Sequence, residues 1–144
     1  MENKQENLHK ELDLIQAVIN RMAANSFEIK KWNLSIVAIV LALGKDDLKN
    51  NQHLLALAIV IGITVFAFWF LDAYFLRLER MYRKLYEYVI EHPDDPKRTR
   101  YNLNVSPYVK NVSSQLGVMF SVSLIPFYLI QLVGLVVLAL VMRS

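Results

Sequence analysis

The chain has 144 residues, of which 55% are hydrophobic and 20% charged, with no cysteine and only four glycines. This length allows about one domain, and the apolar share exceeds the roughly 45–50% of an average soluble domain. The absence of cysteine excludes a disulfide framework, a zinc ribbon and thiol catalysis, and four scattered glycines exclude a phosphate-binding glycine-rich loop. The formal net charge of +3 does not require a nucleic-acid partner, and none is predicted, because a basic cytoplasmic face of the membrane protein predicted below accounts for this charge.

Residues 1–32 are predicted to form a cytoplasmic amphipathic helix. Its apolar side chains alternate at spacings of four and three residues, which is a heptad seam suited to one partner helix. These side chains are Leu8, Leu12, Ile15, Ile19 and Met22. No apolar signal-peptide core is present in this stretch, so the first membrane segment is expected to act as an uncleaved signal.

Three apolar segments predict membrane-spanning helices. Residues 53–76 contain a single charge and, at about 1.5 Å per residue, are long enough for a hydrocarbon core of about 30 Å. Residues 117–142 contain none, and Pro126 is expected to kink this helix. Residues 33–44 are short for a span and need snorkelling lysines, local thinning or extra turns from the preceding residues. The sequence therefore predicts an all-α, multi-pass membrane protein with three transmembrane helices.

Positive charge predicts the orientation of these helices. Five of the 16 Lys and Arg residues precede residue 33, and eight lie between residues 77 and 116. Both regions fall on one side only if residues 33–44 also cross the membrane. The positive-inside rule then places the N-terminus in the cytoplasm, the 45–52 loop outside, and the C-terminus outside a bacterial inner (plasma) membrane.

Residues 77–91 are predicted to continue the second membrane helix into the cytoplasm, because no proline or glycine interrupts it. A second seam follows this helix and is expected to pair with the N-terminal seam as an antiparallel, coiled-coil-like hairpin. Its members are Phe75, Leu78, Tyr82, Leu85 and Val89. Two prolines end the helix, and residues 92–116 are predicted to be a cytoplasmic connector with little regular structure.

Apolar side chains beside the second seam predict contact between copies of the chain. Tyr74, Met81, Tyr86 and Tyr88 lie off the seam and are expected to stay partly exposed, which favours a homo-oligomer. In the alternative, residues 97–116 cover them within one chain. Small residues that let helices approach closely are expected to add to the packing. They form two ladders, Ala58 with Gly62, and Ser113 with Gly117 and Ser121.

Two polar residues lie inside the predicted membrane helices. Asp72 either pairs with a cation near the cytoplasmic end, where Arg77 is one turn away, or lies at an oligomer interface, or serves a pore or proton relay. Gln131 is expected to find a partner inside the bundle. The three histidines lie in separate regions, so no metal site is predicted. No nucleophile, base and acid are arranged for catalysis, so neither enzyme activity nor a cofactor is expected.

A family likeness follows from two stretches. Ala24, Asn25, Ser26 and Phe27 lead into the first membrane segment, and the run FWFLDAYFLRLERMYRKLYEYV, residues 68–89, leads out of the second. Over about residues 10–91 this layout resembles small bacterial membrane proteins of the RipA-like octameric type and SLATT-like effectors of nucleotide-signalled defence systems. The third membrane helix departs from their two-helix plan. The resemblance implies a homo-oligomer in the inner membrane that permeabilises it when triggered.

Two hypotheses of function follow. The first is an oligomeric inner-membrane protein that acts as a regulated pore or as a membrane-disrupting defence effector, with its trigger supplied by another chain. The second is a membrane anchor or scaffold that recruits a cytoplasmic protein partner through its helical stripes. In both, the lipid bilayer is the surrounding partner.

Overall fold

A computed structural model describes residues 2–44, 51–96 and 98–143 of the chain. Its elements are α1 (Glu2–Leu43), α2 (Asn51–Glu91), the short 3-10 helix η2 (Ser106–Asn111), α3 (Gln115–Met119) and α4 (Ile125–Arg143). Over these ranges the chain contains helices and no strand, which confirms the all-α prediction.

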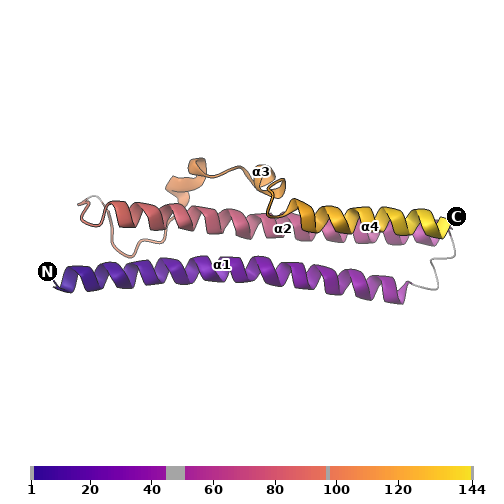
Figure 1. Ribbon diagram of the computed structural model, residues 1–144, viewed down its shortest axis with the longest axis horizontal. Helices are drawn as coiled ribbons and strands as arrows, with labels where there is room; N and C mark the ends of the chain where they lie inside the picture. Colours follow the sequence, from indigo (N-terminus) through magenta and orange to yellow (C-terminus); the bar gives the residue numbers. More distant parts are fainter. Residues whose placement is uncertain (1, 45–50, 97, 144) are drawn as a thin grey trace.

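Helices α1 and α2 run antiparallel along the whole length of the molecule, and α4 lies along α2 at the end where α1 and α2 are joined (Figure 1). Their ends follow from the sequence. Neither proline nor glycine occurs in α1, and Gly44 closes it with a backbone hydrogen bond to the Val40 carbonyl at 3.0 Å. Pro93 follows the end of α2, where proline cannot continue a helix. Most of the predicted 45–52 loop, residues 45–50, lies outside the described residues.

The two predicted seams meet each other within one chain. Ile15 and Ile19 of α1 form a buried core with Leu85 and Val89 of α2, and further apolar side chains surround this core. The surrounding side chains on the two helices are Leu8, Leu12, Tyr82 and Tyr86. We call this half of the hairpin the stalk. Met22 is also buried, and Phe75 and Leu78 are half-buried.

The prediction that Met81 stays exposed is wrong, since only 6% of its surface is exposed. Met81 precedes Leu85 by four residues and Val89 by eight, so the three share one helix face. The stalk buries a stripe wider than a heptad seam, and this stripe includes Met81. Tyr86 and Tyr88 are half-buried, and Tyr74 is exposed.

The connector packs onto the stalk. Leu103, Val105 and Tyr108 contact the stalk core, and the rings of Tyr88 and Tyr108 lie 6.2 Å apart. The connector therefore contacts Tyr88 within one chain, as the second of the two alternatives predicts.

The other half of the molecule is a three-helix bundle with an apolar core. Ile61, Val65 and Ala73 of α2 pack against Val118, Met119, Leu124 and Tyr128 of the C-terminal region. Val37, Val40 and Leu41 of α1 close the core from the other side. We call this half the apolar bundle.

Residues 117–142 are predicted to form one helix kinked at Pro126, and the structure divides them further, into two separate helices. Helix α3 ends at Met119, and α4 begins at Ile125. Pro126 explains the break, because a proline inside a helix lacks the N–H donor and its ring clashes with the carbonyl four residues earlier. As the second residue of α4, Pro126 falls in the first turn, where no donor is needed.

The break also separates the predicted ladder of small residues. Ser113 precedes α3, and Ser121 follows it, so they share no helix face with Gly117. Gly117 instead donates its backbone N–H to the Oγ of Ser114, which caps α3. In the other ladder, Ala58 lines a narrow crevice between α1, α2 and α4, whereas a Cβ at Gly62 would meet open space.

Among the described residues, one helix is long and apolar enough to cross a membrane, and it spans His53–Glu91. A shorter apolar helix spans Ile125–Val141. Large apolar side chains that are more than half exposed cover the outside of the apolar bundle on α1, α2 and α4, which marks a surface for lipid or protein contact. They include Trp32, Ile39, Ile63, Phe66, Ile130, Val136 and Leu140.

We predict that Ile15→Ala lowers the free energy of unfolding of the stalk by about 2–5 kcal/mol, because it leaves a cavity in a fully buried site. The matched control is Leu14→Ala, since Leu14 is 45% exposed on the same helix and surface changes shift stability by about 0.5 kcal/mol. Unfolding of the purified protein in detergent micelles, followed by circular dichroism, measures both. Equal losses in the two variants would contradict this packing.

Candidate functional site

A cluster of polar side chains joins three helices inside the apolar bundle. Asp72 of α2 has no exposed surface, and its carboxylate accepts a hydrogen bond from the Ser26 hydroxyl of α1. The second carboxylate oxygen lies 2.6 Å from Lys30 Nζ of α1 and 2.9 Å from the Tyr128 hydroxyl of α4. We call Ser26, Lys30, Asp72 and Tyr128 the Asp72 cluster.

Local geometry positions each member. Ser26 and Lys30 are four residues apart and therefore share a helix face, and Lys30 Nζ donates to Ser26 Oγ at 3.0 Å. Tyr128 stacks on Trp69 with ring centroids 5.5 Å apart and an interplanar angle of 12°. Trp69 in turn donates its indole N–H to the Met119 carbonyl at 2.9 Å. The aromatic stack thus sets α4 against α2 so that the Tyr128 hydroxyl reaches Asp72.

The cation that pairs with Asp72 is Lys30, from the neighbouring helix. Arg77, the candidate from the sequence, donates its Nε–H to the Ser113 carbonyl at 3.1 Å. Sequence reasoning missed Lys30 and Tyr128 because they lie far from Asp72 along the chain. The same holds for Ser26, which lies 46 residues from Asp72 along the chain.

The buried position of the pair decides what it can do. Removal of one partner from a buried ion pair leaves an uncompensated charge, which is strongly destabilising. The Lys30 side chain is 22% exposed, so the ammonium lies at the edge of the bundle and the carboxylate lies inside it. With three donors on its carboxylate, Asp72 serves as a fixed joint between helices.

Two amide side chains lie one helical turn further into the apolar bundle. Asn33 follows Lys30 on α1 and has no exposed surface, and Gln131 follows Tyr128 on α4. Within the described ranges, neither amide group has a hydrogen-bond partner, so the partner predicted for Gln131 is not found there. A buried polar group without a partner carries a penalty of about 1–3 kcal/mol, so the two amides lower the stability of the bundle.

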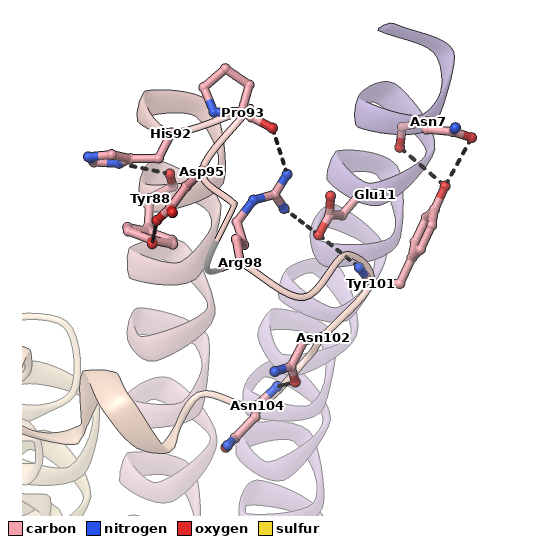
Figure 2. Close-up of polar contacts among 10 residues, drawn as sticks. All are labelled: Asn7, Glu11, Tyr88, His92, Pro93, Asp95, Arg98, Tyr101, Asn102 and Asn104. Carbon is pink, nitrogen blue, oxygen red and sulfur yellow. Dashed lines mark hydrogen bonds and ion pairs between the residues drawn. The ribbon is translucent and has the colours of Figure 1, made fainter. Parts of the chain in front are cut away.

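A second polar site fastens the connector to the stalk (Figure 2). Arg98 Nη1 lies 2.6 Å from Glu11 Oε1, which also accepts the backbone N–H of Tyr101 at 2.9 Å. Arg98 Nη2 donates to the Pro93 carbonyl at 3.1 Å, and the Tyr101 hydroxyl reaches Asn7. Tyr101 has a φ of 60°, a backbone conformation that residues other than glycine rarely adopt. Its two contacts with α1 hold it there.

A cleft of about 390 Å³ lies beside this ion pair. Glu11 and Arg98 are its only charged lining residues in the described chain, and Glu11 Oε2 and Arg98 Nε have no partner there. Tyr88 and Tyr108 also line it. The hydrogen bond to the Asp95 carboxylate raises the pKa of Tyr88, and burial raises the pKa of Tyr108. Both hydroxyls are therefore neutral near pH 7, and the charges of the cleft cancel.

The described residues contain no group of three or more His, Asp or Glu side chains that could hold a metal ion. No protein family, no curated protein and no solved structure matches the chain. The likeness to RipA-like and SLATT-like proteins therefore stays a prediction.

We predict that Asp72→Asn lowers the free energy of unfolding by up to about 3–5 kcal/mol, because Lys30 then lacks its counter-charge in a largely buried site. The double variant Lys30→Met with Asp72→Asn is expected to recover most of that loss. Glu28→Gln is the control, since Glu28 pairs with Lys31 at 2.6 Å on the exposed side of α1, where such pairs contribute about 0–1 kcal/mol.

Thermal unfolding in micelles measures the wild type, the single variants Asp72→Asn and Lys30→Met and their double variant as a cycle, with Glu28→Gln as the control. Additive losses in the cycle, or a loss at Glu28→Gln equal to that at Asp72→Asn, would contradict the coupling of Lys30 and Asp72.

Proposed function

We propose that the protein is a homo-oligomeric, multi-pass inner-membrane protein that acts as a regulated pore, in the manner of a membrane-disrupting defence effector. The observation that carries the proposal is the Asp72 cluster: charged and polar groups gather inside a bundle whose outer surface is apolar. Ionisable groups placed inside a membrane bundle are rare and functional by default.

The compensation of a charge beside the first apolar segment supports three membrane spans. Lys30 precedes the short apolar stretch of α1, and its ion pair with Asp72 compensates its charge. Helix α1 is continuous through this point, so turns from residues 26–32 can lengthen the segment. Helix α4 has 19 residues, or about 28 Å at 1.5 Å per residue, which is close to the thickness of a hydrocarbon core.

Assembly is supported by what fills the bundle. The centre of one chain is packed with side chains such as Ile61, Val65 and Leu124, so ions would pass between copies and not through one chain. The exposed apolar side chains of α1, α2 and α4 offer the surface for such contacts. Because a membrane confines the chains to a small volume, even weakly associating chains form oligomers when the protein is present at a low level.

The orientation is tested with single cysteines, since the chain has none of its own. Lys110 is exposed in the last turn of η2. In intact cells we expect Lys110→Cys to resist a membrane-impermeant maleimide until the membrane is opened. Lys49→Cys in the predicted external loop, outside the described residues, should be labelled at once. The reverse labelling pattern would contradict the proposed topology.

The pore is tested by mass and by leakage. In native lipid discs we expect a protein mass of at least two times 16.7 kDa, and reconstitution of the protein should release a small dye from vesicles. Asp72→Asn is expected to change the leakage rate, because it alters the joint between the three helices. A monomeric mass in lipid discs together with tight vesicles would contradict the proposal.

The second candidate function is a membrane anchor that recruits a cytoplasmic partner. The two seams pack against each other, so a partner would use the cleft between the stalk and the connector, beside Glu11 and Arg98. Co-purification of a soluble protein that is lost in Tyr108→Ala, without vesicle leakage, favours this function over the pore.

A further inference from the structure

We propose that a groove at the junction of the stalk and the apolar bundle binds the phosphate headgroup of an anionic membrane lipid. The inference rests on the proposed insertion of the apolar bundle into a membrane. It adds a specific lipid site that neither the pore nor the anchor function requires.

The groove lies between α2 and the residues that lead into α3. It has a volume of about 260 Å³, with Arg80, Arg83 and Lys84 on the helix side and Asn111 and Ser113 on the other. Residues three and four positions apart share a helix face, so the three cations of α2 point to one side.

Defined contacts hold the second wall of the groove in place. Arg77 Nε donates to the Ser113 carbonyl at 3.1 Å, and the Gln115 side chain donates to the Phe70 carbonyl at 2.9 Å. Both contacts tie the chain entering α3 to the side of α2. The groove is therefore a fixed feature of the fold.

The charge of the groove is positive, and one cation is uncompensated. Arg83 pairs with Glu79 at 2.8 Å, and Lys84 pairs with Glu87, the one acid in the lining, at 2.6 Å. Arg80 has no hydrogen-bond or ion-pair partner anywhere in the described chain. A guanidinium group binds phosphate oxygens through two parallel hydrogen bonds, so Arg80 is the residue that we expect to hold the headgroup.

The surroundings favour a lipid over a soluble phosphate. On α2 the exposed residue Phe70, whose carbonyl accepts the Gln115 side chain of the other wall, precedes Arg80 by ten residues, or about three helical turns. On the other wall, Leu116 and Phe120 are 62% and 64% exposed. A phosphate at Arg80 would thus lie below an apolar surface able to contact acyl chains, and basic residues just inside a membrane span attract anionic headgroups.

The experiment measures lipid retention by native mass spectrometry after the protein is purified in micelles and mixed with phosphatidylglycerol or phosphatidylcholine. We expect the wild-type protein to retain phosphatidylglycerol preferentially. Arg80→Gln should weaken that retention by about fivefold, the effect of one cation near a lipid surface, while Arg80→Lys should weaken it less. The control is Arg21→Gln, which removes the same charge from an exposed position on α1.

Three results would overturn the lipid site. The first is equal retention of the two lipids, and the second is an equal loss in Arg80→Gln and Arg21→Gln. The third is full displacement of phosphatidylglycerol by inorganic phosphate, which would identify a soluble anion as the ligand. Circular dichroism checks that each variant is folded. Membrane insertion is tested separately: wild-type protein that fails to float with vesicles would overturn the proposed function, whereas floating protein without lipid preference would overturn only the lipid site.

Discussion

The ion pair between Lys30 and Asp72 is the interaction on which the rest of the structure depends. Asp72 is fully buried and accepts hydrogen bonds from side chains of α1 and α4. One carboxylate therefore fixes the register of α1 against α2 and the position of α4 on α2. Apolar contacts between helices in lipid specify position weakly, because lipid tails are as apolar as the side chains. A buried charge pair has few acceptable geometries, and it therefore provides the specificity that the apolar contacts lack.

The two halves of the molecule arrange polar and apolar groups in opposite ways. The apolar bundle has an apolar surface and a polar joint at Asp72, whereas the stalk has a polar surface and an apolar core around Ile15 and Val89. The polar contact of the stalk lies beside its core and not within it, because the ion pair of Arg98 with Glu11 fastens the connector to α1. Both arrangements follow from the solvent that each half is expected to meet, since buried polar groups need partners and apolar groups need only cover.

Helix α2 carries both halves, because α1, η2, α3 and α4 all pack against it. A change at the connector or at the Asp72 cluster therefore acts on one continuous helix of 41 residues. If the proposed pore has a cytoplasmic trigger, α2 is the element that would connect it to the bundle. The cleft beside Arg98 and the groove beside Arg80 lie along that helix.

The sequence by itself determined the two long helices and their antiparallel pairing. Their apolar periodicity is uninterrupted, Gly44 and Pro93 follow their ends, and the predicted seams of Ile15 and Leu85 pack against each other. Tertiary structure alone decided that Lys30 and not Arg77 pairs with Asp72, that Met81 is buried, and that Glu11 meets Arg98. It also decided that the last apolar segment breaks before Pro126, with the Met119 carbonyl bonded to Trp69. Local pattern records which face of a helix is apolar, but the identity of a partner 42 to 87 residues away depends on how the helices are placed in space.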